Sequence, residues 1–458
     1  MRHYDVVVIG AGSGNMVIDG SLAGLDVAIV EERLFGGTCL NFGCIPSKML
    51  AYAAEVAGIV RDADRYDVDA ELRRVRWTDL RDRVFARLDA EEAEGRAGRE
   101  RSDFVTVYPG HARFVGAKTL EIDVDGESVT IEADQIVIAA GGRPTVPPPV
   151  EESGLPYETS DTIMRIDSPP RRLAVLGGGY VAAELAHVFA AAGAEIVIVE
   201  QAELLLGQQD EAVAKAFTDL MRERYELRLG RELKKVEGGP GALRLVLDDG
   251  SVVEADTLLV AVGRTPNSAG LDLEKAGIKT SDDGRVVVDE FQRTSVDGVY
   301  ALGDICTPYP LKHVANREAE VVAHNLRYPD DLRATDHSVV PAAVFTDPQI
   351  ASVGATEQEC REAGKDYVAA SHQYGDVAYG WAMEDTTGFC KVLADRATGR
   401  LLGAHIMGPQ AATLIQPLVV AMTLDIDART LAEQPYWIHP ALTEVISNAL
   451  QNLDLPSN

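Results

Sequence analysis

Two glycine-rich turns, each entered from a run of β-branched residues, constrain the fold of this chain more than any other feature. The first run is YDVVVIG, which ends at Gly10 and leads into the turn AGSGN over residues 11–15. A second apolar run, residues 27–30, ends in Glu31. Strand, glycine turn, helix, strand and acid in this order are typical of a dinucleotide site, where glycines let the backbone approach a pyrophosphate and the acid binds ribose hydroxyls. Asn15 stands where that pattern has its third glycine, and taken alone the motif is weak.

The same pattern occurs again in the middle of the chain. Residues 173–184 read LAVLGGGYVAAE, and the run IVIVE that follows ends in Glu200. The three glycine positions of this second turn are Gly177, Gly179 and Ala182. The segments IVIAAGGRP (136–144) and LLVAVGRTP (258–266) also resemble each other, as if each unit closed with the same strand and turn. Since chance duplication of both halves is improbable, the sequence predicts an α/β fold with two dinucleotide sites.

Charge and hydropathy narrow the class of protein. The chain has 458 residues, with 43 Lys and Arg against 72 Asp and Glu, which gives a formal net charge of −29. Binding to nucleic acid or to an anionic membrane needs concentrated basic residues, so neither is expected. No apolar run approaches the roughly 18 residues of a membrane span, and the N-terminal segment is too short and strand-like for a signal peptide. We therefore expect a cytoplasmic protein with a small-molecule partner.

One pair of cysteines has a spacing that suggests chemistry. Five cysteines in a chain of this length exclude a disulfide scaffold, but Cys39 and Cys44 lie close together in GGTCLNFGCIPSK. Five steps along an ideal helix place two residues about 140° apart, so a bond between these two requires Cys39 to lie before or at a distorted helix start. The glycines at 36, 37 and 43 permit such a distortion, and a helix N-terminus stabilises thiolate, the nucleophilic form.

The alternatives for this pair are a metal half-site and two inert cysteines. Zinc needs two further ligands, and neither CxxC nor HxxxH spacing occurs elsewhere, so no metal is expected. The isolated Cys306, Cys360 and Cys390 are most simply small apolar residues. A redox-active pair is the interpretation that the spacing favours.

The segment GGTCLNFGCIPSK resembles the redox-active disulfide of the flavin-dependent pyridine nucleotide disulfide oxidoreductases, the class of glutathione reductase and lipoamide dehydrogenase. Matching motifs run along nearly the whole chain: GAGSGN with Glu31, GHA at 110–112, AAGGRP, GGGYVAAE, GRTPN, ALGDI at 301–305, VVPAAVFTDPQIASVG and HPALTE at 439–444. The resemblance implies two Rossmann-like domains, which bind FAD and NAD(P), and a C-terminal α+β domain that forms a homodimer. The expected division is residues 1–148 and 270–335 for the FAD domain, 149–269 for the NAD(P) domain, and 336–458 for the dimerisation domain.

The resemblance also implies the chemistry of the site. Electrons pass from NAD(P)H through FAD to the Cys39–Cys44 disulfide and on to a low-molecular-weight disulfide, with Cys44 beside the flavin and Cys39 open to substrate. Thiol exchange needs an acid for the departing thiolate, and His439, oriented by Glu444, matches that position in the partner's active site. Taken alone, a histidine before proline is more often a helix-start or surface residue.

The cofactor residues follow from the same motifs. The residues matched to FAD are Gly10, Gly12, Ser13, Gly14, Asn15, Glu31, Gly37, Thr38, Lys48, His111, Ala112, Ala140, Gly141, Asp304 and Ala315. Those matched to the nicotinamide nucleotide are Gly177, Gly179, Tyr180, Val181, Glu184, Glu200, Gly263 and Arg264. Lys48 and Glu184 are expected to meet near the flavin, Tyr180 to gate the nicotinamide pocket, and Asp304 to bind the ribityl chain.

Substrate and nucleotide choice rest on smaller features. The segment after the first turn, NMVIDGSLAG, lacks the arginines with which glutathione reductase usually holds its tripeptide. Segments such as YPLKHVANREA and QPYWIHPALTE look like a branch that reduces the disulfide of a sugar-bearing thiol. Lipoamide dehydrogenase is the enzymatic alternative, and an FAD-binding protein that responds to nicotinamide without catalysis is the other.

The nucleotide prediction departs from that branch, whose members are expected to use NADPH. Recognition of a 2′-phosphate uses arginines after the second strand, but here Glu200 is followed by no arginine until Arg222. Ala182 points weakly towards NADPH. Because a carboxylate repels a phosphate at contact distance, Glu200 predicts a preference for NADH.

Overall fold

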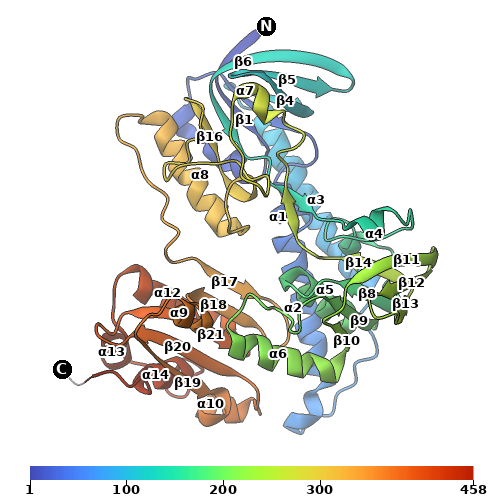
Figure 1. Cartoon of the computed structure of the whole chain (residues 1–458), viewed down its shortest axis with the longest axis vertical. Helices are drawn as coiled ribbons and strands as arrows, with labels where there is room; N and C mark the ends of the chain where they lie inside the picture. The colour runs from blue at the N-terminus through green and yellow to red at the C-terminus, as the bar shows by residue number, and fades with distance from the viewer. Residues whose placement is uncertain (457–458) are drawn as a thin grey trace.

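The first β-branched run becomes the centre of a parallel sheet in the computed structural model, which describes residues 1–456 (Figure 1). Strand β1 (Arg2–Ile9) pairs in parallel with β2 (Val27–Glu31) and with β6 (Glu127–Ile138), and its last four residues are buried. The seven-stranded sheet has the order β3-β2-β1-β6-β5-β4, with β16 beside β6. Its other strands are β3 (Val105–Pro109), β4 (His111–Gly116), β5 (Thr119–Val124) and β16 (Val299–Ala301). Because β16 joins this sheet, the chain returns to the first unit after forming the second.

The second unit repeats the arrangement around β8. Its parallel sheet has the order β10-β9-β8-β14, and three antiparallel strands lie beside it in the order β11-β12-β13. The strands are β8 (Arg172–Leu176), β9 (Glu195–Glu200), β10 (Glu226–Leu229), β11 (Leu233–Gly239), β12 (Ala242–Leu247), β13 (Val252–Ala255) and β14 (Thr257–Val260). The two segments that resemble each other in sequence end β6 and β14 and then pair antiparallel, as β7 (Gly142–Pro144) and β15 (Arg264–Pro266). This short ribbon joins the two units.

The last unit is a five-stranded antiparallel sheet, ordered β17-β18-β21-β20-β19, with short helices around it. Its strands are β17 (Pro341–Val344), β18 (Ile350–Gly354), β19 (Tyr367–Gln373), β20 (Phe389–Asp395) and β21 (Leu401–Met407). Its helices are α9 (Glu357–Glu362), α10 (Ala378–Ala382), α11 (Ala411–Leu414), α12 (Gln416–Thr423), α13 (Ala428–Glu433) and α14 (Glu444–Gln451). The predicted fold class, two Rossmann-like units and a C-terminal α+β unit, is confirmed. The boundaries at residues 148, 269 and 335 stay predictions.

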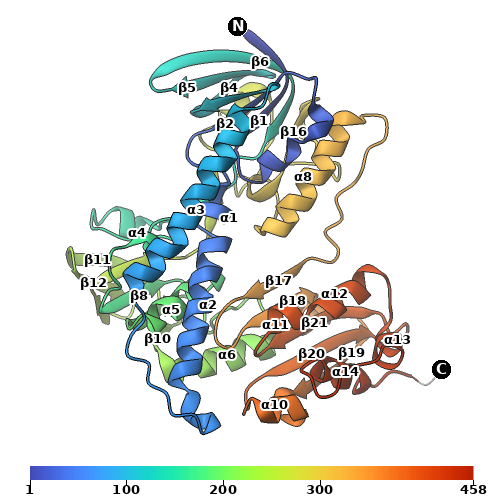
Figure 2. The same ribbon diagram turned by 180° about the vertical axis from the view of Figure 1, so that it is seen from behind.

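Helices α2 and α3 run from the first unit down to the second (Figure 2). The helices of these units are α1 (Gly37–Asn41), α2 (Cys44–Arg61), α3 (Trp77–Glu100), α4 (Pro148–Glu151), α5 (Tyr180–Ala191), α6 (Glu211–Arg224), α7 (Leu273–Ala276) and α8 (Lys312–Arg327). Within residues 1–456, none of the helices has both the length and the apolar character needed to cross a membrane.

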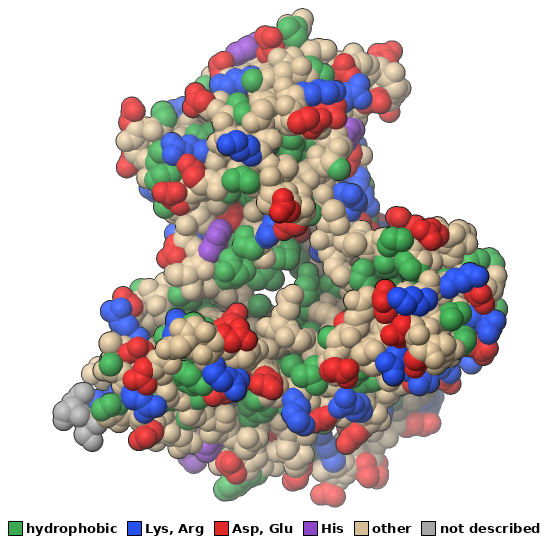
Figure 3. Space-filling model, viewed as in Figure 1, with side chains coloured by type: hydrophobic (Ala, Val, Ile, Leu, Met, Phe, Trp, Pro, Cys, Tyr) green, Lys and Arg blue, Asp and Glu red, His purple; other side chains and the backbone are tan. Residues whose placement is uncertain are grey.

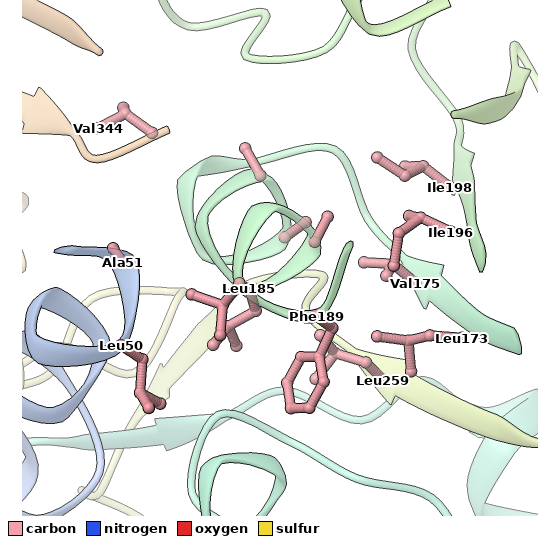
Figure 4. Close-up of a cluster of buried hydrophobic side chains, with 14 of the residues drawn as sticks. Leu50, Ala51, Leu173, Val175, Leu185, Phe189, Ile196, Ile198, Leu259 and Val344 are labelled. Carbon is pink, nitrogen blue, oxygen red and sulfur yellow. The ribbon is translucent and has the colours of Figure 1, made fainter. Parts of the chain in front are cut away.

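The apolar face of α2, the helix that begins at Cys44, packs against α5. Figure 4 shows Leu50 and Ala51 of α2 in one cluster with Leu185 and Phe189 of α5. Leu50 and Phe189 are fully buried, and each such side chain contributes about 2 kcal/mol by leaving water. The second turn of α2 is therefore packed against the second nucleotide unit.

The helix predicted after the first glycine turn is not formed, and that prediction is wrong. Two 3₁₀ turns, Ser13–Val17 and Gly20–Leu22, replace it. The side chain of Asp19 accepts a hydrogen bond from the Ser21 backbone N–H at 2.7 Å, which favours the break. The carbonyls of Asn15 and Ile18, which an α-helix pairs internally, instead accept hydrogen bonds from Arg99 of α3.

A buried ion pair joins the second unit to the C-terminal sheet. Lys391 of β20 lies 2.7 Å from Asp210 and 2.6 Å from Glu357. Asp210 is fully buried and also caps α6 by accepting from the Ala212 backbone N–H. Burial opposes ionisation of Asp210, but hydrogen bonds from Lys391 and from the Glu357 backbone outweigh it and lower its pKa. Breaking such a pair costs about 3–5 kcal/mol, so it holds the two units in a defined orientation.

Candidate active site

The two cysteines of GGTCLNFGCIPSK lie on different helices. Cys39 is in the short helix α1, and Cys44 is the first residue of α2. The helical conformation is interrupted between them at Gly43, where a Cβ would lie 3.0 Å from the Thr38 carbonyl oxygen. Asn41 fixes α1 by donating its side-chain amide to the carbonyls of Phe35 and Gly37. The expected distortion is therefore a complete break, which brings the two thiols together.

The thiols form an asymmetric pair. Both cysteines are free, Cys39 half-buried and Cys44 exposed. A hydrogen bond from the Cys39 thiol lowers the pKa of Cys44 to about 7, with a further contribution from the charge of Lys48. The same hydrogen bond and burial raise the pKa of Cys39. When the dithiol loses a proton, the negative charge therefore lies on Cys44, while Cys39 keeps its proton.

Lys48 and Glu184 meet beside this pair, as the family resemblance implies. The Lys48 ammonium donates to both carboxylate oxygens of Glu184, at 2.9 and 2.8 Å. Glu184 is buried and also accepts from the Phe345 backbone N–H at 3.0 Å, while the Phe345 ring lies 4.9 Å from the Lys48 nitrogen. Glu184 of α5 and Phe345, which directly follows β17, thus hold the Lys48 cation about a turn of helix away from Cys44.

The first glycine of each glycine turn has the same local geometry. Gly10 and Gly177 both have positive φ, 103° and 110°. A Cβ on Gly10 would lie 2.3 Å from the Ala139 carbonyl oxygen, and one on Gly177 would lie 2.4 Å from that of Ala261. Any side chain at either position would collide with the backbone of the neighbouring strand. Each turn is therefore an open backbone cradle of the kind that admits a pyrophosphate.

The cysteine segment lies directly against the first cradle. A Cβ on Gly37, at the start of α1, would lie 2.7 Å from Gly12 Cα. Glu31, at the end of β2, accepts from the backbone N–H groups of Ala11 and Arg33 at 2.7 and 2.8 Å. Burial raises the pKa of Glu31, and these two hydrogen bonds oppose that shift. The open glycine backbone, which admits a pyrophosphate, and the acid Glu31, which can bind ribose hydroxyls, fit FAD at this turn.

Asp304 and Arg264 close the site from the side of β15. Asp304 lies in the 3₁₀ turn Gly303–Ile305, and its carboxylate is 3.7 Å from the Arg264 guanidinium. Burial raises the pKa of Asp304, and Arg264 opposes that shift. Arg264 also donates to the Gly142 carbonyl at 2.5 Å and to the Thr38 hydroxyl at 3.5 Å. Arg264 therefore links the second unit to the segment that carries Cys39.

A cavity of about 1020 Å³ lies beside the second glycine turn. Figure 3 shows the molecule hollowed between its upper part, which holds the first sheet, and the two lower parts. Predicted nicotinamide residues that line the cavity are Gly177, Gly179, Tyr180, Val181, Glu200, Gly263 and Arg264, with Asp304 at the same cavity. Tyr180 is 41% exposed at the start of α5. The volume and the glycine backbone fit a nicotinamide nucleotide.

Acidic groups control the charge of this cavity. The Glu200 carboxylate lies against the second turn, 2.9 Å from where a Cβ on Gly178 would be, and accepts from the Ala202 backbone N–H. Each arginine of the lining has a carboxylate within 4.0 Å: Arg231 with Asp249, Arg264 with Asp304, and Arg285 with Asp283. The cavity therefore offers Glu200 to a ribose and no unpaired arginine to a phosphate.

His439 lies far from the cysteines of its own chain. It is in the connection between α13 and α14, and both views show these two helices well away from α1 and α2, which carry the cysteines (Figures 1 and 2). Its Nδ1 is 2.8 Å from Glu444, the first residue of α14, and this contact lowers the pKa of Glu444. The His439 side chain is 72% exposed. The neighbouring Tyr436 and Ile438 are exposed as well.

The other predicted cofactor residues occupy turns and strand ends around the first cradle. His111 uses both ring nitrogens within the protein, at 2.6 Å from Glu32 and 2.7 Å from the Gly270 carbonyl. The remainder are Ser13, Gly14 and Asn15 in the first turn, Ala112 in β4, Ala140 and Gly141 after β6, and Ala315 in α8. Which of them contact a cofactor stays a prediction.

Sequence reasoning missed three basic or aromatic residues of the site. Phe345 contacts the Lys48–Glu184 pair. In the first glycine turn, Lys312 donates to the Ser13 hydroxyl and Arg99 donates to the Asn15 side chain. Lys312 could have been found, because it lies in the segment YPLKHVANREA, one of those that resemble a particular branch of the family. Arg99 stands in a charged helix where nothing in the local pattern marks it.

Family comparisons cover the two parts of the chain separately. Residues 4–319 match the model of the pyridine nucleotide-disulphide oxidoreductases, and residues 340–450 match the dimerisation domain of the same family. The sequence-based resemblance to this family is confirmed.

Individual relatives are similar along the full length. The chain is 49% identical over 462 residues to "Mycothione reductase" of Mycobacterium tuberculosis (strain ATCC 25618 / H37Rv), covering 99% of this chain and 100% of the relative. It is 35% identical to "Dihydrolipoyl dehydrogenase" of Haloferax volcanii, covering 98% and 96%. Among solved structures, the HOCl-induced flavoprotein disulfide reductase RclA of Escherichia coli matches with a TM-score of 0.85 and 26% identity, covering 98% and 100%.

Proposed function

Because the chain belongs to the pyridine nucleotide-disulphide oxidoreductase family, an FAD-dependent family that uses NAD(P)H, we propose that it reduces mycothione, the disulfide of mycothiol, with NADH. The observation that carries the substrate is the 49% identity over the whole length of a relative named mycothione reductase. The relatives named dihydrolipoyl dehydrogenase are less similar, at 30–35% for those that span the chain. Dihydrolipoamide is therefore the second candidate.

The thiol pair accounts for the disulfide step. FAD, when bound at the first cradle, supplies the relay that carries two electrons from the nicotinamide to the cysteines. In the reduced pair, Cys39 loses its proton and its sulfur attacks one sulfur of the substrate, so that a mixed disulfide forms and one thiol leaves. The Cys44 thiolate then attacks Cys39, which restores the Cys39–Cys44 disulfide and releases the second thiol. One NADH and one proton are consumed for each disulfide reduced to two thiols.

His439 is the acid and base of this exchange in our proposal. Glu444 holds Nδ1, and among the described residues no hydrogen bond engages Nε2. The imidazole can therefore take the proton of Cys39 at Nε2 and return it to the departing thiolate. Since His439 is exposed and lies far from its own cysteines, this role requires a second copy of the chain. The match to a dimerisation domain supports such a homodimer.

Glu200 supports NADH as the reductant. Its carboxylate lies at the turn where the adenosine ribose is expected and can accept hydrogen bonds from the 2′-hydroxyl. A 2′-phosphate at the same place would meet a negative charge, and each arginine of the cavity is already paired with an acid. Desolvated like charges at contact distance are unfavourable, so NADPH is the weaker reductant.

One experiment tests substrate and nucleotide together. The purified yellow protein is assayed for oxidation of NADH and of NADPH with mycothione, glutathione disulfide and lipoamide as electron acceptors. We expect kcat/KM to be highest with mycothione and at least about tenfold higher with NADH than with NADPH, which corresponds to about 1.4 kcal/mol.

The variant Glu200→Gln provides the matched control, because it keeps the shape of the side chain and removes its charge. It should bring kcat/KM with NADH and kcat/KM with NADPH closer together, without changing the order in which the three disulfides rank. A higher kcat/KM with NADPH would overturn the nucleotide assignment, and a higher value with lipoamide would replace mycothione. Absence of disulfide-dependent oxidation with all three acceptors would point to the non-catalytic alternative.

A further inference from the structure

The first glycine turn has lost the usual source of positive charge for a pyrophosphate. In the dinucleotide fingerprint this charge comes from the macrodipole of the α-helix that the turn opens. Here the turn opens only the five-residue 3₁₀ turn Ser13–Val17, whose peptide dipoles sum to little. The chain as a whole carries a net charge of −29, which repels an anionic cofactor. A compensating charge must therefore come from elsewhere.

Two cations contact this turn from opposite parts of the sequence. Arg99, in the last turn of α3, donates to the side chain of Asn15 at 2.6 Å and to the carbonyls of Asn15 and Ile18, both at 2.8 Å. Lys312, the first residue of α8, donates to the Ser13 hydroxyl at 2.9 Å. The two side chains thus bind residues on either side of Gly14, in the centre of the glycine turn.

Neither cation has an ion-pair partner in the described part of the chain. The negative groups of the protein that act on them without forming such a pair are Asp19 near Arg99, and Asp304 with the two thiols of the redox pair near Lys312. Both are half-buried, and burial lowers the pKa of each. An unpaired, partly buried cation is costly unless a bound anion compensates it. Placing two of them at the same turn indicates that an anion belongs there.

We propose that Arg99 and Lys312 supply the countercharge for the diphosphate of FAD, in place of the helix that is absent from this turn. Asn15 is part of the same arrangement, since its side chain and its carbonyl both accept hydrogen bonds from Arg99. A glycine at this position, the third of the pattern, would offer Arg99 only the carbonyl. Both residues are positioning residues of the cofactor site. The inference does not depend on which disulfide the protein reduces.

The test is the dissociation constant of FAD, measured by flavin fluorescence on the full chain at low and at high NaCl concentration. Arg99→Met and Lys312→Met should each weaken FAD binding about tenfold at low salt, with a smaller loss at high salt because the interaction is electrostatic. Lys312→Arg should keep most of the affinity. Arg96→Met is the matched control, because Arg96 lies on the same helix but pairs with Glu100 at the surface.

A second variant separates charge from turn geometry. Asn15→Ala removes one of the three hydrogen bonds to Arg99 and leaves its charge, so it should lower FAD affinity less than Arg99→Met and keep the normal salt dependence. Should Arg99→Met fail to fold, Arg99→Gln, which retains donors but no charge, replaces it. Unchanged FAD affinity in the methionine variants, or a loss that is equal at both salt concentrations, would overturn the proposal. So would a loss in Asn15→Ala as large as in Arg99→Met. These measurements need neither NADH nor mycothione, so they stand or fall separately from the proposed function.

Discussion

Cys39→Ser is expected to lose disulfide-dependent turnover while its reduced form keeps a long-wavelength absorbance band, which reports a thiolate next to flavin. Cys44 carries the thiolate of the pair, because hydrogen bonding from Cys39 lowers its pKa to about 7. A serine hydroxyl can make the same hydrogen bond, but it cannot form the mixed disulfide with substrate. The band should grow as the pH rises through about 7, since the thiolate is the form present above the pKa.

Two further variants sharpen this assignment. Cys39→Ala removes the donor to Cys44, so the pH midpoint of the band should move above that of Cys39→Ser. Cys44→Ser should lose both the band and turnover. Retention of the band in Cys44→Ser together with its loss in Cys39→Ser would exchange the roles of the two cysteines.

His439→Gln is expected to slow thiol exchange by about 10²–10⁴-fold, the usual contribution of a positioned acid or base. Stopped-flow measurements divide the reaction into reduction of the enzyme by NADH and its reoxidation by mycothione. Only the second half-reaction moves a proton between thiols, so only the second should become slow.

A histidine of the same unit is the matched control. His372 of β19 is half-buried and contacts the side chains of Asn448 and Asn452. His372→Gln should leave both half-reactions close to those of the unchanged protein. Equal slowing of both half-reactions in His439→Gln would indicate a structural role for this residue.

The fold was predictable where short patterns repeat. The runs before Gly10 and Gly177 form β1 and β8, the acids at 31 and 200 end the next strands, and both glycines have nearly the same φ. These features depend on neighbours in sequence and on the period of buried strands. The two units and the mixed C-terminal unit could therefore be predicted from the printed residues.

The pairing of distant residues was predictable only through resemblance to a family. Lys48 and Glu184 are 136 positions apart, and their contact depends on how α2 packs on α5. No periodicity of either helix predicts that contact. The resemblance supplied it, and it also supplied His439, whose local sequence is that of an ordinary surface histidine.

The connection between β1 and β2 shows why the remaining features were missed. The sequence pattern predicted a helix after the glycine turn at residues 11–15, but the conformation depends on Arg99, which lies 84 positions from Asn15. A guanidinium that binds two carbonyls stabilises a 3₁₀ turn where the dinucleotide pattern predicts a helix. Such tertiary override cannot be read from the turn itself.

The distance between His439 and the cysteines of the same chain makes two inactive variants complementary. In a dimer that shares its sites across the interface, a Cys39→Ser chain contributes an intact histidine and a His439→Gln chain contributes intact cysteines. Each mixed dimer therefore contains one complete site and one site with both defects. If the two chains are coexpressed in equal amounts and pair at random, half the dimers are mixed, and about a quarter of the normal activity should return. Coexpression that restores nothing would show that each chain completes its own site.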